Sequence, residues 1–271
     1  MDFQFSGDQR LLKKTVRDFA ERELKPHARE WDEKQEFPRE IFRKLGELGL
    51  LAVVFPEDYG GSGMSTVDYT IVIEELARID AGVALSTAAH NSLSSGHIFL
   101  AGTEEQKKKY LPKLATGEFV GAWGLTENSA GSDAGGTRTT AVKDGDSWVL
   151  NGSKTFITNG QTANLICVVA KTDPALGAKG TSLLFVETDG AEGFEQGPVG
   201  QARADRARLT ANQRTERELG TARSLLHHLV SESPTVLYAL RLEKAYARFL
   251  ELMQVEAKNF PDGRSVWRNE S

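Results

Sequence analysis

The sequence predicts an α+β chain in three parts: an all-helical domain over residues 1–120, an antiparallel, barrel-like β domain over residues 121–195, and a short helical tail over residues 196–271. In the first part, apolar residues recur at helical spacing behind serine and threonine capping signals. In the second, short apolar runs are separated by two-residue turns. Near residue 195 the basic residues change from mostly lysine to mostly arginine, which marks the tail.

Start and stop signals divide the first part into helices. Ser6, Ser65 and Thr103 each stand three residues before a glutamine or aspartate, the pattern that opens a capped helix. Pro38 suits the first turn of another helix, and Pro26 is expected to kink or end the first one.

Residues 82–100 are mostly small and apolar, which predicts a buried helix. His90 and His97 lie two helical turns apart in it, so they could share a face. No carboxylate or third ligand is visibly paired with them, and we therefore predict no metal site.

Turn signals divide the second part into strands. Asp144-Gly145 and Asn151-Gly152 are typical of two-residue hairpins. The expected strands cover residues 138–142, 148–150, 155–158, 165–170 and 182–186. Cys167 stands within an apolar run, which favours a buried strand residue over a nucleophile.

A glycine-rich stretch, residues 124–136, follows a strand-like lead at 119–123. It has little side-chain surface to bury, so its backbone N–H groups must meet water or a ligand. Glycine allows close approach to that ligand and positive φ, and successive N–H groups can form a concavity that suits a pyrophosphate. The alternative is a solvated surface loop, which is the commoner role of such stretches.

Overall charge and cysteine content narrow the classes of partner. The net charge of −5 argues against nucleic acid as the main partner, and the single cysteine fits a reducing compartment. The first residues lack the basic start and apolar run of a secretion signal, and no apolar window approaches membrane-spanning length. We therefore expect a cytoplasmic protein, or one of the mitochondrial matrix if the source is eukaryotic, with no membrane partner.

Residues 124–136 resemble, position by position, the first signature of the acyl-CoA dehydrogenase family, including Thr126-Glu127 and Gly131-Ser132-Asp133. Residues 151–160 are similar to the family's other flavin-contacting hairpin and lie at the expected distance. The resemblance covers residues 3–194 and is strongest to the short-chain, butyryl-type branch.

This resemblance implies FAD as cofactor and an acyl-CoA thioester as substrate. In the family, a carboxylate base removes the α-proton while the β-hydride passes to the flavin, and the product is the trans-2-enoyl-CoA. The resemblance also implies electron-transfer flavoprotein as the acceptor and a homotetramer as the assembly.

By resemblance, Trp123 and Leu125 would line the flavin ring and Phe156 would pack on it. Thr126 would bind the pyrimidine edge, where negative charge builds on reduction, and Thr158 would bind near N5. Ser132 would serve both the FAD pyrophosphate and the substrate's pantetheine arm. The full set of expected cofactor contacts is Trp123, Gly124, Leu125, Thr126, Gly131, Ser132, Phe156, Ile157 and Thr158. Without the motif, the aromatic residues would be assigned to a core and the threonines to ordinary strands.

The catalytic residue is not assigned. Glu127 is interpreted as structural, since the family's base lies elsewhere, and residues 195–271 carry no family motif that marks one. Glu243, Glu251 and Glu256 lie on a predicted helix of the tail, where solvent-facing charges are the ordinary interpretation. The alternative is therefore a truncated, frameshifted or fused product, either a flavin- or acyl-CoA-binding remnant or a partner-binding module. A third, weaker alternative is a flavin monooxygenase or oxidase on the same fold.

Overall fold

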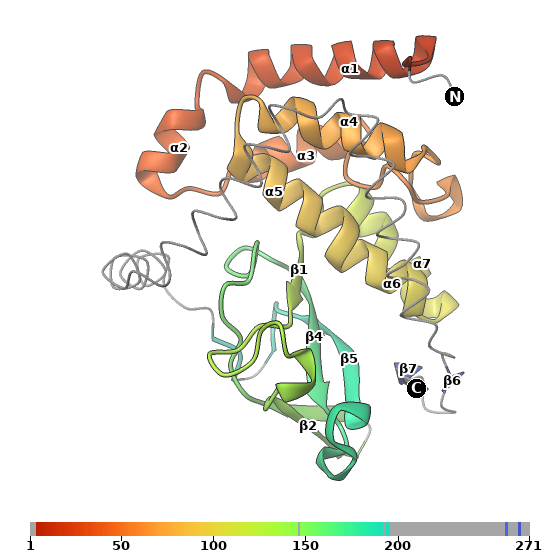
Figure 1. Cartoon of the computed structure of the whole chain (residues 1–271), viewed down its shortest axis with the longest axis vertical. Helices are drawn as coiled ribbons and strands as arrows, with labels where there is room; N and C mark the ends of the chain where they lie inside the picture. Colours follow the sequence, from red (N-terminus) through yellow and green to blue (C-terminus); the bar gives the residue numbers. More distant parts are fainter. Residues whose placement is uncertain (1–3, 146, 192, 196–257, 260–264, 267–271) are drawn as a thin grey trace.

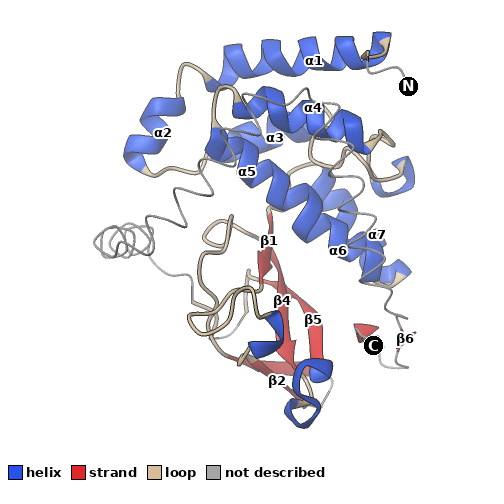
Figure 2. Cartoon of the chain, viewed as in Figure 1, coloured by secondary structure: helices blue, strands red, loops and turns tan. Residues whose placement is uncertain are grey.

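Helices gather at one end of the molecule and strands at the other (Figures 1 and 2). The computed structural model describes residues 4–145, 147–191, 193–195, 258–259 and 265–266. The helices expected within residues 196–257 lie outside these described residues. Within them, the order of an all-helical domain followed by a β domain is as predicted.

The helical domain runs from α1 to α7. Its elements are α1 (Gly7–Phe19), the π-helical turn η1 (Ala20–Leu24), α2 (Ala28–Lys34), α3 (Arg39–Glu47), the 3-10 turn η2 (Glu57–Tyr59), α4 (Thr66–Ala77), α5 (Ala81–Ala88), the π-helical turn η3 (Ala89–Ser95), α6 (Gly96–Ala101) and α7 (Glu104–Ala115). No described helix is long and apolar enough to span a membrane.

The capping signals are confirmed in full. Ser6, Ser65 and Thr103 each form a reciprocal capping box with the residue three positions later, at the start of α1, α4 and α7. Pro38 stands one position before α3 and not inside its first turn. Helix α2 was not predicted from the sequence, because it buries no residue and therefore has no apolar periodicity to detect.

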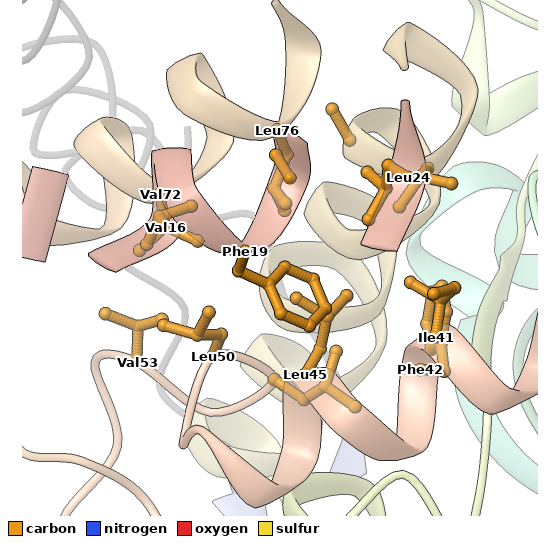
Figure 3. Packing of buried hydrophobic residues seen from close by; sticks show 14 of the residues in the cluster. Val16, Phe19, Leu24, Ile41, Phe42, Leu45, Leu50, Val53, Val72 and Leu76 are labelled. Carbon is orange, nitrogen blue, oxygen red and sulfur yellow. The ribbon is translucent and has the colours of Figure 1, made fainter. Parts of the chain in front are cut away.

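The main apolar core lies between α1, α3 and α4 (Figure 3). Burying side chains of this size contributes about 1.5–3 kcal/mol each. The largest fully buried members of this cluster are Leu24, Phe42, Leu45, Leu51 and Leu76. The predicted buried helix over residues 82–100 is confirmed as α5, η3 and α6 in succession.

One buried carboxylate joins α1 to α4. Glu75 is 1% exposed and accepts two hydrogen bonds from Arg17, both at 2.9 Å. Arg78 donates a further bond at 3.0 Å, and Lys13 lies 3.3 Å away. The surrounding cations compensate the cost of removing this charge from water.

The β domain is a mixed sheet and not the antiparallel barrel that we expected. Its strands are β1 (Gly121–Gly124), β2 (Thr140–Asp144), β3 (Ser147–Asn151), β4 (Leu165–Lys171), β5 (Thr181–Glu187), β6 (Lys258–Asn259) and β7 (Ser265–Val266). The order is β3-β2-β4-β5-β7-β6, and β1 also pairs with β4. β1 and β2 pair with β4 in parallel, whereas β2–β3 and β4–β5 are antiparallel. Parallel pairing requires a long crossover, which single-strand patterns do not reveal.

The two hairpin signals have opposite outcomes. Asp144 pairs with Ser147 across Gly145, whose φ is 57°, so the first hairpin is confirmed. The second is wrong, because β3 ends at Asn151 and residues 155–158 belong to no strand. The positive φ of Phe156, 57°, is incompatible with an extended strand.

Cys167 lies fully buried in β4, as expected for a strand residue. Burial raises the pKa of its thiol to about 12. Because the thiolate is the nucleophilic form, this environment keeps Cys167 unreactive.

We expect Glu75→Gln to lower the free energy of unfolding by about 1–3 kcal/mol, because charge-assisted hydrogen bonds between α1 and α4 are lost. Urea denaturation followed by circular dichroism measures the change. Lys14→Gln is the matched control, since its pair with Asp18 on α1 is exposed and should change stability by less than about 0.5 kcal/mol. Equal effects of the two variants would contradict the role given to Glu75.

Candidate functional site

Strand β1 positions the first candidate segment, residues 124–136. Its Trp123 pairs with Cys167 of β4, and its indole stacks on the His97 ring with centroids 3.8 Å apart and planes 21° from parallel. Burial lowers the pKa of His97, so its ring is neutral near pH 7. The packing between α6 and β1 therefore fixes the indole plane.

The first segment begins with a tight turn. Glu127 and Ala130 exchange backbone hydrogen bonds of 2.8 and 3.2 Å, which leaves Asn128 and Ser129 exposed. Gly131 and Ser132 follow and are also exposed.

Two glycines of this segment, Gly135 and Gly136, lie where an added Cβ would meet a neighbouring side chain closely. We expected positive φ values at the glycines of this segment. This expectation is wrong, because φ is not positive at Gly124, Gly131, Gly135 or Gly136. A Cβ added to Gly136 would lie 2.7 Å from Asp133 Oδ2, which is too close for any larger residue to fit without movement.

The second candidate segment, residues 151–160, forms an irregular turn whose backbone is strained. Phe156 and Asn159 have left-handed φ values of 57° and 66°. For a phenylalanine this conformation costs about 1–3 kcal/mol, so the surroundings must hold it in place. Asn159 is tied down by hydrogen bonds from Nδ2 to the carbonyls of Ser86 and Gly121, at 3.0 and 3.1 Å. The Phe156 side chain is nevertheless 70% exposed.

The structure brings the two segments into contact. The Thr155 N–H donates to the Thr126 carbonyl at 2.8 Å, and Lys154 Nζ donates to the Leu125 carbonyl at 3.0 Å. Segments that are separated in sequence by two strands therefore form one surface region.

A buried polar cluster lies beneath this contact. Lys154 Nζ lies 2.7 Å from Glu127 Oε1 and 2.9 Å from Thr137 Oγ1, and the two charged side chains are 11% and 6% exposed. Glu127 also accepts hydrogen bonds from the Thr137 hydroxyl, the Arg138 N–H and both the N–H and the hydroxyl of Thr139. We call these five residues the Glu127 cluster.

The Glu127 cluster keeps its carboxylate ionised. Burial by itself would raise the pKa of Glu127, but the hydrogen bonds from Lys154, Thr137 and Thr139 hold that pKa well below its usual range. A carboxylate with so many donors is a poor proton acceptor, which agrees with the structural interpretation of Glu127. Lys154 was not predicted as a site residue, because its only signal in the sequence was a lysine within a segment of small and β-branched residues.

His90 is occupied at both ring nitrogens. Nδ1 accepts the Gly121 N–H at 3.0 Å, and Nε2 lies 3.0 Å from the Leu114 carbonyl, to which it must donate. Burial lowers the pKa of His90 to about 4, so the ring stays neutral. Among the described residues, no group of three or more His, Cys, Asp or Glu side chains is arranged to hold a metal ion.

Comparison with known proteins identifies the family. The family model "Acyl-CoA dehydrogenase, N-terminal domain" matches residues 6–118, and "Acyl-CoA dehydrogenase, middle domain" matches residues 122–213. This chain belongs to the acyl-CoA dehydrogenase family. The second match continues beyond residue 194, where the sequence resemblance was placed to end.

Similar proteins include a short-chain-specific acyl-CoA dehydrogenase of Clostridium acetobutylicum, 45% identical over 78% of this chain and 55% of the relative. Butyryl-CoA dehydrogenase of Megasphaera elsdenii has a similar structure, with a TM-score of 0.69 and 42% identity over 73% of this chain and 52% of that one. A glutaryl-CoA dehydrogenase of Mycobacterium smegmatis in complex with FADH2 has a TM-score of 0.64 and 38% identity over 68% and 46% of the two chains. This chain thus spans about half the length of such acyl-CoA dehydrogenases.

The nine residues that the family resemblance assigned to cofactor contact all lie in or beside the two segments. Trp123 and Gly124 end β1, and Leu125 and Thr126 stand at the junction with the second segment. Of the remaining five, Ile157 and Thr158 are half-buried, whereas Gly131, Ser132 and Phe156 are exposed. Their roles toward a cofactor stay predictions.

The depressed pKa of Glu127 predicts acid sensitivity. Below pH of about 4.5, this carboxyl takes up a proton in the unfolded chain but stays ionised in the folded one, so stability falls as pH falls. In Glu127→Gln this dependence should be weaker, by up to about 1.4 kcal/mol per pH unit. Urea denaturation at pH values from about 5 to about 3.5 measures both slopes.

The exposed Glu118→Gln variant controls for the loss of one negative charge. Identical slopes for the wild type and Glu127→Gln would show that the cluster does not hold an ionised carboxylate.

Proposed function

We propose that residues 124–136 and 151–160 bind FAD, and that the protein oxidises an acyl-CoA thioester to the trans-2-enoyl-CoA in fatty-acid or branched-chain catabolism. The observation that carries this proposal is the hydrogen-bonded contact between the two segments, from Thr155 to Thr126 and from Lys154 to Leu125. The complex of the similar M. smegmatis enzyme with FADH2 supports the choice of cofactor.

The residues present fit a flavin. Phe156 is a large aromatic side chain that is 70% exposed although its strained backbone is held in place, and an aromatic face of this kind suits stacking on a planar ring. Three residues along the chain, Asn159 Oδ1 is buried and has no hydrogen-bond partner among the described residues. A buried acceptor of this kind needs a partner, which a bound group can supply.

In this proposal different residues contact different parts of the cofactor. Trp123 and Leu125 would border the ring, with the indole plane fixed by His97, and Gly124 would allow close approach. Thr126, Ile157 and Thr158 would contact the polar edges of the ring. Gly131 and Ser132, exposed in the middle of the first segment, would contact the pyrophosphate, and Ser132 would also border the pantetheine arm of the substrate.

When bound, FAD supplies the hydride acceptor; the protein must position the substrate and remove its α-proton. Glu127 is unsuited to that second task because its carboxylate is already held by five donors. We assign the base to no described residue. The proposal includes electron-transfer flavoprotein as the electron acceptor and a homotetramer as the assembly. It also includes a cytoplasmic location, or the mitochondrial matrix in a eukaryote.

The decisive experiment is anaerobic titration of the FAD-loaded protein with butyryl-CoA. We expect the purified protein to bind FAD, become yellow and bleach as the substrate reduces the flavin. A yellow protein that no acyl-CoA bleaches would favour the non-catalytic alternative. A protein that binds no FAD would overturn the proposal.

Replacing Phe156 by alanine should weaken FAD binding about two- to tenfold, because a stacked aromatic contact contributes about 0.5–1.5 kcal/mol. Quenching of flavin fluorescence measures the affinity. Stability should change little, since the side chain is mostly exposed. Val142→Ala, which shortens a 60% exposed side chain on β2, is the matched control and should keep the wild-type affinity. Equal affinities of all three proteins would exclude Phe156 from the site.

A further inference from the structure

The Leu125–Thr126 peptide has a fixed direction. Its carbonyl accepts a hydrogen bond from Lys154 Nζ at 3.0 Å, and the chain has no cis peptide bond among the described residues. In a trans peptide the carbonyl and the following N–H point in opposite directions. The Thr126 N–H therefore points away from the Glu127 cluster.

The Thr126 N–H is also unoccupied. Its own carbonyl is used by the Thr155 N–H, but within the described part of the chain no acceptor lies in hydrogen-bonding position for its amide. Thr126 is half-buried, so the residue as a whole is not closed off from solvent. A backbone donor that is oriented before a ligand arrives costs no reorganisation on binding.

Lys154 cannot serve a ligand directly, because its three N–H donors are already matched by three acceptors. They are the Leu125 carbonyl, the Glu127 carboxylate and the Thr137 hydroxyl. Glu127 also balances its charge. What Lys154 can transmit to the site is therefore the orientation of a peptide and not a free positive charge.

We propose that Lys154 and Glu127 are positioning residues, whose buried ion pair orients the Leu125–Thr126 peptide so that the Thr126 N–H binds the pyrimidine edge of the flavin. This inference rests on the proposed function. Negative charge develops at that edge on reduction, so an aimed N–H stabilises the reduced form more than the oxidised form. The ion pair would thereby raise the reduction potential of the bound flavin as well as its affinity.

A buried ion pair is an energetically costly way to hold two chain segments together. Buried charges pay a large desolvation cost, and well-packed apolar side chains often hold chain segments together equally well. An ammonium group with three fixed acceptors supplies a direction that apolar contacts lack. The need to fix the direction of the Leu125–Thr126 peptide accounts for a buried lysine and glutamate at these two positions.

The test compares Lys154→Met and Glu127→Gln with the wild type. The measurements are the FAD dissociation constant and the midpoint potential of the bound flavin, taken by anaerobic dye equilibration. We expect Lys154→Met to weaken FAD binding about tenfold or more and to shift the potential to a more negative value. Glu127→Gln keeps the shape and an acceptor for Lys154, so it should shift both quantities in the same direction by less.

Glu75→Gln is the matched control. It removes a carboxylate that is equally buried and paired, but between α1 and α4 in the helical domain. It should lower the melting temperature while leaving FAD affinity and potential at their wild-type values. A loss of flavin properties in this variant would show that general destabilisation explains the effect, and would overturn the inference.

The outcomes separate this inference from the proposed function. A wild-type protein that binds no FAD would overturn both. Wild-type and Lys154→Met proteins that bind FAD with equal affinity and equal potential would overturn the inference alone. If the variants do not fold, hydrogen exchange of the wild type decides: the Thr126 amide should exchange readily without FAD and be protected with it. An amide already protected without FAD would overturn the inference.

Discussion

The arrangement of the site depends on how the first peptide groups of β1 are held. The Gly121 N–H is bound by His90 of η3, and the Gly121 carbonyl is bound by Asn159 of the second segment. A Cβ at Gly121 would lie 2.6 Å from Ser94 Cβ, so only glycine allows the strand to approach the helix this closely. One residue thus connects the helical domain, the sheet and the second segment.

This connection explains why two distant segments meet. β1 is placed against η3 at Gly121 and leads within a few residues to Leu125 and Thr126. Asn159 places the second segment against the same glycine, so Lys154 and Thr155 reach the carbonyls of Leu125 and Thr126. The hydrogen bonds of the Glu127 cluster then hold the two segments in position relative to each other. The helical domain therefore contributes to the site through the position of the strand, in addition to any contact with a ligand.

The features that could be predicted from the sequence are those determined by residues close together in the chain. The capping boxes at Ser6, Ser65 and Thr103 were identified because each cap and its partner are three residues apart. The parallel pairing of β1 with β4 was not, because its partners lie more than forty residues apart and neither strand records its neighbour. The irregular segment at residues 155–158 was mistaken for a strand because threonine, phenylalanine and isoleucine favour strands. The hydrogen bonds of Asn159 and the Thr155–Thr126 bond hold this segment in its irregular conformation.

The candidate site likewise combines features that the sequence indicates with features that appear only in the folded chain. Its nine residues were assigned from the resemblance of two segments to a family, and not from any physical property that a single sequence displays. Lys154 was missed because a lysine reveals nothing about a carboxylate 27 positions earlier that will neutralise it. Glu127 was interpreted as structural, but its partners could be identified only from the folded chain. Burial and pairing are properties of the fold, so a buried ion pair is among the last features that sequence reasoning can recover.

The polar groups of this region divide into those that the protein satisfies and those that it leaves open. The carbonyls of Gly121, Leu125 and Thr126 each receive a donor from another segment. An unsatisfied buried polar group costs about 1–3 kcal/mol, so such bonds are expected throughout an ordinary interior. Against that background, the Thr126 N–H and Asn159 Oδ1 have no hydrogen-bond partner among the described residues, and the Phe156 ring is exposed. A donor, an acceptor and an aromatic face are the groups that the proposed binding of a flat heteroaromatic ring requires.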